Sequence, residues 1–389
     1  MSKTNEKISP SGRSVEAVRG LILLVGDLIL DEPNPSILFD EVREILQNAD
    51  VVVGHVEVPH TNRGKDSYFD IPAPPAKPEH LEALKNAGFH LVTLAGNHFF
   101  DAGKEGVEDT IAKLHSLNIK TTGAGMDLAE ARKPAIFEKE GIKIGVLSYN
   151  CVGPRESWAN EKKAGVAYIR VITHYELNHA NPGGTPEVFT FAEPQSLETM
   201  QFDIENLKKQ VDVVIVALHK GIVHTPIEIA MYERQIAKAA IEAGADVVVG
   251  HHAHILKGIE FYKGKPIFHG LGNFVTVTKA LNVAENASPE RLAWAKKRTK
   301  LFGFERMEDY PNYPFHPESR NTIIASIAIG ANGIEKVGFI PCWIQPNGSP
   351  KPLENNQKGQ EVVEYVQQIS EKAGFEINIQ YIDNEIVVK

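Results

Sequence analysis

Short apolar runs and longer amphipathic segments alternate along much of the chain. We expect the apolar runs to form buried strands over 21–25, 51–53, 89–94, 211–218 and 247–249. Between them, apolar residues recur at helical spacing, and we expect helices over 37–48, 79–88, 105–117, 200–209 and 233–243. Strands that alternate with helices of this length are typical of a parallel α/β core.

Two β-hairpins and one further helix are expected outside this alternation. Apolar residues over 135–148 flank a turn at Gly141, and those over 322–341 flank a turn at Gly333. Glycine permits the tight turns that join two antiparallel strands, so both segments predict hairpins. The segment 359–373 returns to helical spacing and predicts a helix near the end of the chain.

The remaining stretches set the expected domain organisation. Residues 1–20 are polar and predict a disordered tail, whereas 21–389 predict a single domain. Within that domain, 150–194 and 279–320 predict loop or helical inserts, because connections of such length are usually functional or disordered. The basic run at 296–298 is expected to be a solvated helix face; the alternative is a lid that meets an anionic substrate.

Composition narrows the classes of protein that fit. The chain has 389 residues, 42% of them hydrophobic, which is enough for a large core. Its 41 basic and 50 acidic residues give a net charge of −9, which argues against a general nucleic-acid or membrane surface. Cys151 and Cys342 have no paired spacing, so neither a disulfide framework nor a thiolate zinc site is expected. We expect a cytoplasmic protein without a membrane anchor, because no apolar run reaches membrane-spanning length.

Potential metal ligands follow the predicted strands, where open α/β sheets place their sites. These side chains are Asp27, Glu57, Asn97, His98, His219, His252 and His254. Oxygen and nitrogen donors of this kind suit divalent zinc, manganese, iron or nickel. The spacing of His252 and His254 would let two imidazoles converge on one metal from an extended loop, and Glu57 could bridge two ions about 3.5 to 4 Å apart. The alternative is a set of partly buried histidines whose hydrogen bonds are satisfied within the fold and which have no role in a site.

Seven short blocks occur in order between Leu21 and Val275. They are Gly26-Asp27, Gly54 to Thr61, Gly96-Asn97-His98 with Asp101 and Gly103, Gly123-Ala124-Gly125, His219-x-Gly221, Gly250-His251-His252-x-His254 and Leu271-Gly272-Asn273-Phe274. Together they resemble the bacterial CapA/PgsA family, which is known from poly-γ-glutamate capsule synthesis and is similar in fold to calcineurin-like metallophosphoesterases. The resemblance implies a calcineurin-like four-layer α/β/β/α sandwich that carries the two inserts.

The resemblance also implies roles for individual residues. Asp27 would bind one divalent ion, Glu57 would bridge two ions, and Asn97 and His219 would bind the second. His252 and His254 would give one ligand to each ion, which would be manganese, zinc or iron. His98 would act as the acid that protonates a leaving group or would stabilise an oxyanion, and Asp101, three residues later, could fix its tautomer.

Two positions depart from the pattern of the metallophosphoesterases. The histidine that usually follows the first aspartate by two residues is replaced by Ile29, which removes one ligand from the first site. His55 stands where relatives usually have asparagine. It could replace the missing ligand, act as a base on the substrate, or support Glu57 by hydrogen bonding.

The function expected from these residues is that of a metal-dependent hydrolase. It would cleave a phosphoester or a γ-glutamyl-type amide in an anionic small-molecule or peptide substrate. One alternative is a metal-independent epimerase that uses His55 and His98 as an acid/base pair. Another is an accessory protein of poly-γ-glutamate synthesis. No nucleic-acid or membrane partner is expected, and a homo-oligomer is compatible with the sequence.

Overall fold

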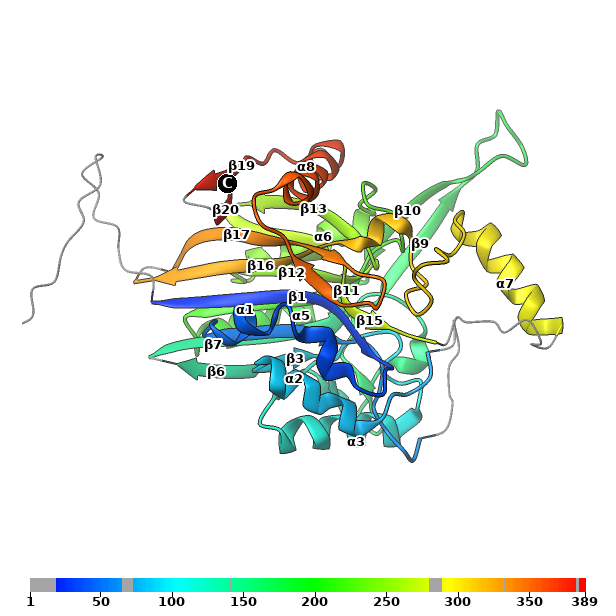
Figure 1. The fold of residues 1–389 in the computed structure, drawn as a ribbon. Helices are drawn as coiled ribbons and strands as arrows, with labels where there is room; N and C mark the ends of the chain where they lie inside the picture. Colours follow the sequence, from blue (N-terminus) through cyan, green and yellow to red (C-terminus); the bar gives the residue numbers. More distant parts are fainter. Residues whose placement is uncertain (1–18, 65–72, 140, 280–288, 332, 383–384) are drawn as a thin grey trace, which may run out of the picture.

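The computed structural model describes residues 19–64, 73–139, 141–279, 289–331, 333–382 and 385–389. The described chain contains two large β-sheets with helices on the outside (Figure 1). In the first sheet the strand order is β19-β20-β17-β16-β1-β2-β3-β4, with β15 beside β1 and β18 beside β17. The bounds are β1 (Gly20–Leu30), β2 (Val51–Val56), β3 (Leu91–Thr93), β4 (Lys120–Thr122), β15 (Asn273–Val277), β16 (Asn321–Gly330), β17 (Gly333–Ile344), β18 (Pro350–Pro352), β19 (Ile379–Ile382) and β20 (Glu385–Val388).

The second large sheet has the order β13-β14-β12-β11-β7-β6. Its strands are β6 (Ala135–Lys139), β7 (Ile142–Asn150), β11 (Val213–Lys220), β12 (Val247–His252), β13 (Leu256–Tyr262) and β14 (Lys265–Leu271). Two small antiparallel pairs accompany it, β5 (Ala124–Gly125) with β8 (Gly165–Val166), and β9 (Val171–Glu176) with β10 (Glu187–Ala192). The β9–β10 hairpin projects from the body of the molecule (Figure 1).

Helices and short 3₁₀ segments connect the strands. They are η1 (Pro35–Phe39), α1 (Arg43–Gln47), η2 (Pro78–Leu81), α2 (Glu82–Ala87), α3 (Gly103–Ser116), α4 (Leu128–Ala131), η3 (Arg155–Ser157), α5 (Pro194–Lys208), α6 (Met231–Glu242), α7 (Pro289–Phe302), η4 (Pro317–Arg320) and α8 (Gln357–Lys372). Among the described residues, none of these helices combines the length and the apolar character needed to cross a bilayer.

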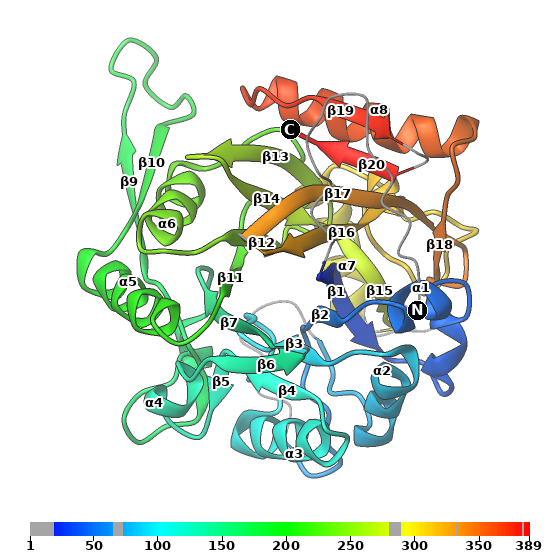
Figure 2. The ribbon, with the colours of Figure 1, turned by 90° about the vertical axis from the view of Figure 1, so that its left-hand side faces the viewer.

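Three apolar cores hold the layers together. Between the sheets, Ile22 and Val53 of the first sheet belong to the same core as Val146 and Ile215 of the second. A second core joins the outer face of the first sheet to α1, α2 and α3, and a third joins the outer face of the second sheet to α5 and α6. Figure 2 shows these two helix groups on different sides of the sheets. The expected four-layer α/β/β/α order is therefore confirmed.

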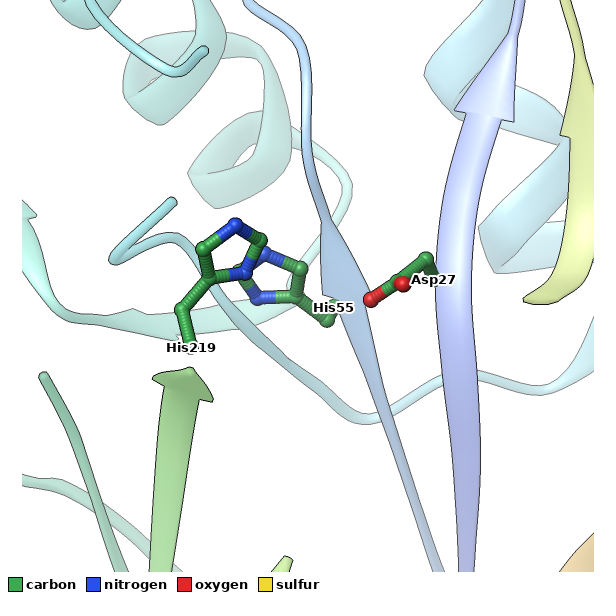
Figure 3. Close-up of side chains that lie close together, drawn as sticks. All are labelled: Asp27, His55 and His219. Carbon is green, nitrogen blue, oxygen red and sulfur yellow. The ribbon is translucent and has the colours of Figure 1, made fainter. Parts of the chain in front are cut away.

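The strands that were expected to be parallel are parallel, and three of them end later than the apolar runs suggested, whereas β3 is shorter than expected. β1 continues through Asp27, β11 through His219 and β12 through His252. Because the carboxyl ends of parallel strands meet at one edge, side chains of both sheets converge there, including Asp27, His55 and His219 (Figure 3). The polar ends of the strands are thus buried within the sheets.

The expected single helix over 37–48 is wrong. The structure has η1, a turn and then the short helix α1. Arg43 explains part of the break, because its guanidinium donates to the carbonyl of Ser36 and to the carboxylate of Asp40. The first of these bonds satisfies the Ser36 carbonyl, which a continuous helix would have paired with a backbone N–H one turn later. The antiparallel strand β13 was not expected from the sequence.

The tail and the inserts are only partly described. Residues 1–18 lie outside the described residues, and β1 begins at Gly20, inside the expected tail. The insert over 150–194 contains η3, β8 and the β9–β10 hairpin. The insert over 279–320 is described from 289 onward, where it forms α7 and η4, with Lys296 and Lys297 exposed as expected. The single-domain division stays a prediction.

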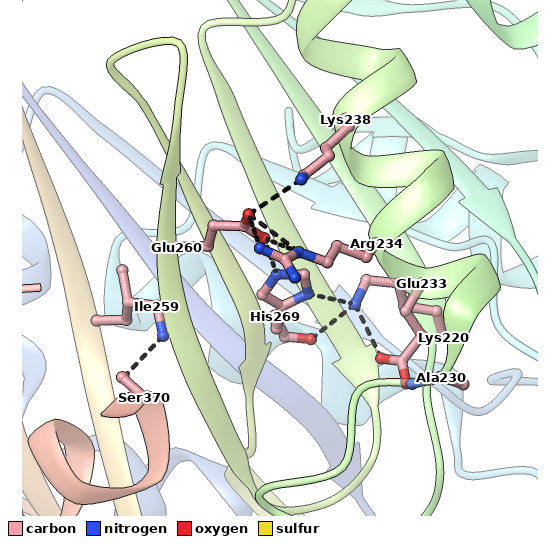
Figure 4. Close-up of polar contacts among 9 residues, drawn as sticks. All are labelled: Lys220, Ala230, Glu233, Arg234, Lys238, Ile259, Glu260, His269 and Ser370. Atoms are coloured by element: carbon pink, nitrogen blue, oxygen red, sulfur yellow. Dashed lines mark hydrogen bonds and ion pairs between the residues drawn. The ribbon is translucent and has the colours of Figure 1, made fainter. Parts of the chain in front are cut away.

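A buried charge network ties the end of β11 to α6, β13 and β14 (Figure 4). The Nζ atom of Lys220 donates to Oε2 of Glu233 at 3.0 Å and to the carbonyl of His269 at 3.1 Å. Lys257 donates to Oε1 of the same glutamate at 3.2 Å, and Nε2 of His269 lies 3.1 Å from Oε2 of Glu260. Lys220, Glu233 and Lys257 have fully buried side chains, so their charges depend on one another.

The ionisation of this network follows from burial and pairing. Burial opposes the ionisation of Glu233, but the two lysine charges outweigh it and bring the pKa of its carboxyl down to about 2. Burial lowers the pKa of Lys257 to about 8. One carboxylate therefore compensates two buried ammonium groups.

We predict that Glu233→Gln lowers the free energy of unfolding by about 3–5 kcal/mol, because it leaves buried ammonium groups without a carboxylate. Urea denaturation followed by circular dichroism measures the effect. Glu242→Gln is the matched control on the same helix, since its partners Tyr262 and Lys263 are exposed at the surface, and its stability should change little. Equal effects of the two substitutions would show that the buried network does not stabilise the fold.

Candidate metal centre

Strand register places the candidate ligands side by side at one edge. Asp27 lies opposite His55 in the β1–β2 pair, and His219 lies opposite His251 in the β11–β12 pair. The two sheets meet at these positions, because the His55 ring lies 4.7 Å from both the His219 and the His251 rings. Figure 3 shows Asp27, His55 and His219 pointing toward one another from three strands.

Three sets of side chains offer ligand atoms that lie within 4.8 Å of one another. The sets are Asp27 with His55 and His219, Glu57 with His219 and His252, and Asp27 with Glu57 and His254. Since Asp27, Glu57 and His219 each belong to two sets, the sets form one continuous cluster. The structure thus brings together five of the six expected metal ligands, and it adds His55.

Several atoms of this cluster that could bind a metal are buried and have no hydrogen-bond partner among the described residues. They are Oδ1 of Asp27, Oε2 of Glu57, Nε2 of His55, Nδ1 of His219 and Nδ1 of His252. A buried polar atom without a partner costs about 1–3 kcal/mol, so folded proteins rarely keep several of them together. A divalent cation would satisfy these atoms at once, and we conclude that the donor set fits a metal.

The two carboxylates of the cluster are completely buried. Burial, reinforced by the charge of Glu57, raises the pKa of the Asp27 carboxyl well above its usual range. Burial acts the same way on Glu57, but the charge of His254 outweighs it and lowers the pKa of Glu57 to about 2. The Nε2 atom of His254 lies 3.2 Å from Oε1 of Glu57, and its Nδ1 atom lies 3.5 Å from Oδ2 of Asp27. His254 is therefore the positive group between two buried acids.

Most imidazoles of the cluster are held neutral. Burial lowers the pKa of His252 to about 3 and that of His251 to about 4. Burial, with the neighbouring histidines, holds the pKa of His55 and of His219 well below the usual value. Neutral imidazoles keep a lone pair on one nitrogen, and this is the form that binds zinc, manganese or iron.

The His252–His254 segment has a strained backbone rather than the extended form expected from its sequence. The φ angles of His252 and His254 are 84° and 53°, in the left-handed region that favours glycine. Such a conformation costs about 1–2 kcal/mol for each residue and is typical of functional sites. It also places the two imidazoles in different sets of ligands, instead of on one ion.

The residues that follow β3 face the same cluster. Oδ1 of Asn97 lies 2.7 Å from Nε2 of His219, so the two expected ligands of the second ion are in contact. Nδ1 of His98 lies 2.8 Å from Oδ2 of Asp101, and this hydrogen bond raises the pKa of His98 against the effect of burial. The structure thus brings these residues together as expected, and their chemical roles stay predictions.

The two departures from the metallophosphoesterase pattern have different structural settings. Ile29 is buried in an apolar cluster with Val58 and Phe315, so it offers no ligand. His55 accepts or donates one hydrogen bond, between its Nδ1 and Oγ1 of Thr93 at 3.0 Å, and its Nε2 is among the buried atoms without a partner. Because His55 belongs to the set with Asp27 and one of its nitrogens has no partner among the described residues, its position is compatible with the role of substitute ligand.

Sequence reasoning missed the groups that position His254. Nδ1 of His254 lies 2.9 Å from Oδ1 of Asn273, and Nδ2 of Asn273 donates to the hydroxyl of Tyr313 at 3.0 Å. Asn273 follows a buried strand within one of the seven blocks, and that signal could have identified it. Tyr313 lies in the second insert, where no spacing or motif marks it.

The second insert also contributes an aromatic wall beside the cluster. The Phe315 ring lies 4.7 Å from His254, and Phe304 lies 4.9 Å from His224. His224, which has a φ angle of 56°, donates its backbone N–H to the carbonyl of Ala253 between the two histidine ligands. Residues far apart in the sequence therefore shield one side of the cluster from water.

Known structures with similar arrangements are distant from this chain. A putative 5′-nucleotidase from Staphylococcus aureus, solved with α-ketoglutarate, is 12% identical, with a TM-score of 0.43 over 90% of this chain and 58% of that one. The calcineurin-like phosphoesterase YfkN from Bacillus subtilis is 14% identical, with a TM-score of 0.37 over 92% of this chain and 99% of that one.

Relatives in sequence have names that concern polymer synthesis. The PGA biosynthesis protein CapA of Bacillus subtilis is 30% identical over 64% of this chain and 62% of its own length. The capsule biosynthesis protein CapA of Bacillus anthracis is 27% identical over 65% of this chain and 58% of its own length. The chain thus matches less than two thirds of either relative. The family model of the bacterial capsule synthesis protein PGA_cap matches residues 21–278, and the chain belongs to this family, as its seven blocks predicted.

Proposed function

We propose that the chain is a metal-dependent hydrolase that cleaves a phosphoester or a γ-glutamyl-type amide with water. The observation that supports this most directly is the cluster of buried carboxylate and imidazole atoms that have no partner among the described residues. Residues that served only the fold would pair these atoms with one another. Ligands from both sheets instead surround one common centre.

Each residue has a definite task in this proposal. Asp27, Glu57, His219, His252 and, after losing its proton, His254 would hold two divalent ions, with Asn97 beside His219 and His55 in place of the ligand lost at Ile29. When bound, such ions lower the pKa of a water molecule to near neutrality and stabilise a developing oxyanion. His98 donates a proton to the leaving group, and Asp101 holds its Nδ1–H so that Nε2 faces the reaction.

The proposed substrate is an anionic peptide or small molecule. The relatives are named for PGA biosynthesis and, in Mycobacterium tuberculosis, as a probable polyglutamine synthesis accessory protein. Glutamyl polymers carry both amide bonds and many carboxylates, which makes a γ-glutamyl-type amide a candidate for cleavage. The same mycobacterial name supports the second candidate function, an accessory role in polymer synthesis without turnover.

The epimerase alternative needs two acid/base groups that reach a substrate carbon. His55 does not meet this need, because only 1% of its surface is exposed and its ring is packed between His219 and His251. Its pKa lies well below the usual value, so its conjugate acid is not available near neutral pH. The geometry of His55 therefore favours metal binding over proton transfer.

Glu57→Gln and His252→Ala should each reduce metal content and abolish hydrolysis while the fold persists. Either substitution removes a charge or a nitrogen donor that the ions cannot easily replace. Elemental analysis and turnover assays measure the two effects. His174→Ala, which removes an exposed histidine on the β9–β10 hairpin, is the matched control and should leave both unchanged. Wild-type metal content and turnover in the Glu57 and His252 variants would place the site elsewhere.

Asp101→Asn should leave metal content nearly intact and lower kcat by about tenfold to a hundredfold, as outer partners of a metal site commonly do. The Asp101 carboxylate accepts the Nδ1–H of His98 through either oxygen, whereas an asparagine amide accepts it only through Oδ1. The variant therefore fixes the His98 tautomer less well. Steady-state kinetics with parallel elemental analysis measure the change. An unaltered kcat would mean that Asp101 does not support His98.

A chelator experiment separates hydrolysis from epimerisation. Activity on a panel of phosphoesters, γ-glutamyl amides and peptides should vanish with a chelator and return with a divalent ion. The same reactions run in deuterated water should give cleaved products without deuterium at the substrate Cα. Deuterium uptake that resists the chelator and occurs without bond cleavage would contradict the hydrolase proposal.

A further inference from the structure

A cavity of about 470 Å³ opens beside α5, formed by the first insert together with residues of α5, β7 and the α4 region. This is within the range of about 300–1,000 Å³ that is usual for ligand pockets. Its lining residues are Leu128, Arg132, Tyr149, Arg155, Trp158, Tyr168, Arg170, Glu193, Gln195, Ser196 and Thr199. Neither the metal ligands nor His98 lie among them, so the cavity is a separate feature of the molecule.

The cavity is basic, although the chain as a whole has a net charge of −9. Three arginines and one glutamate line it. Arg132 is already bound to the carboxylate of Asp203 through two hydrogen bonds, of 2.6 and 2.8 Å. In contrast, Arg155 and Arg170 are exposed, and neither forms a salt bridge within the described part of the chain. Two guanidinium groups are therefore available to a ligand.

The base and walls of the cavity are rigid. The hydroxyl of Tyr149, whose side chain is buried, donates to the same Asp203 carboxylate at 2.7 Å and fixes the base together with Arg132. On one wall the rings of Trp158 and Tyr168 are stacked at 4.3 Å with an angle of 5° between their planes. The guanidinium of Arg155 lies over the Trp158 ring, 5.8 Å from its centroid, so this wall presents apolar contact area and positive charge together.

The amino terminus of α5 also borders the cavity. The 15-residue helix begins at Pro194, and Ser196 and Thr199 of its first turns line the cavity. Glu193 caps the helix by accepting the backbone N–H of Ser196 at 2.8 Å, so its charge is already used within the helix terminus. The Glu193 carboxylate thus already compensates the helix dipole, and the arginines are the groups left to bind an anion in the cavity.

The cavity and the metal cluster occupy the same strand ends on opposite faces of the second sheet. Tyr149 precedes Asn150, which lies opposite His219 in the β7–β11 pair. Tyr149 packs with Leu218 in the core under α5 and α6, whereas His219 faces the other sheet. The cavity and the metal cluster therefore lie near the same edge of the second sheet, one on each of its faces.

We propose that this cavity binds an oxyanion group, carboxylate or phosphate, of an anionic ligand, with Arg155 and Arg170 as the recognition residues. Guanidinium groups bind both oxyanions through paired, charge-assisted hydrogen bonds, and the aromatic wall accepts the apolar part of the ligand. The inference requires binding alone, so it does not depend on the hydrolysis proposed for the metal centre.

Isothermal titration calorimetry of the full chain tests the inference with three probes: a γ-linked tetraglutamate, an α-linked tetraglutamate and inorganic phosphate. At least one probe should bind the wild type, and Arg155→Ala/Arg170→Ala should weaken that binding by at least about tenfold, since hydrogen bonds to charged groups are lost. Binding of the peptides would identify carboxylate as the ligand group, and binding of phosphate alone would identify a phosphate site.

Two control variants make the result specific. Lys104→Ala/Lys209→Ala removes the same charge from exposed positions outside the cavity lining and should bind like the wild type. Glu57→Gln disrupts the metal cluster and should keep the arginine-dependent binding even if all hydrolysis is lost. Absence of binding to every probe, equal affinity in the arginine variant, or loss of that binding in Glu57→Gln would overturn the inference.

Discussion

The burial of two carboxylates, Asp27 and Glu57, is the constraint on which the rest of this structure depends. Neither side chain is exposed, and both belong to one set of ligand atoms with His254. Charges removed from water in this way must be compensated: His254 pairs with Glu57, and burial beside Glu57 raises the pKa of the Asp27 carboxyl well above its usual range. The neutral imidazoles around them add lone pairs rather than charge. A divalent cation would favour the ionised form of both carboxylates and would also satisfy the ligand atoms that lack partners.

The fold makes this concentration of polar groups possible by sharing it between two sheets. Parallel strands bring Asp27, His55 and Glu57 from one sheet and His219 and His252 from the other. The unfavourable free energy of burying polar groups is therefore divided among several segments. Support comes from outside the cluster. The left-handed backbone of the His252–His254 segment is strained, and the Lys220–Glu233–Lys257 network fixes the strand that carries His219. The free energy of the strained backbone is thus offset by the buried ion pairs of the Lys220–Glu233–Lys257 network.

Much of this arrangement could be predicted from the sequence, because strand, turn and ligand signals are local. The apolar runs predicted the parallel strands. The positions at the ends of those runs predicted Asp27, Glu57, His219 and the two later histidines as site residues. Contacts between distant segments left no such signal. The hydrogen bond from Asn273 to Tyr313 and the packing of Phe315 on His254 join the centre to the second insert, whose composition resembles that of a solvated helix. The role of His55 also depended on knowing that its ring meets His219 across the sheets.

The most direct test of the account is a titration of the chain with Mn²⁺, followed by electron paramagnetic resonance. If Glu57 bridges two ions about 3.5 to 4 Å apart, binding should saturate near two ions for each chain, with the spectrum of an exchange-coupled pair. Binding of only one ion, with an uncoupled spectrum, would contradict a shared bridging carboxylate. Failure of the chain to bind Mn²⁺, Zn²⁺ or Fe²⁺ in stoichiometric amounts would contradict the metal centre itself.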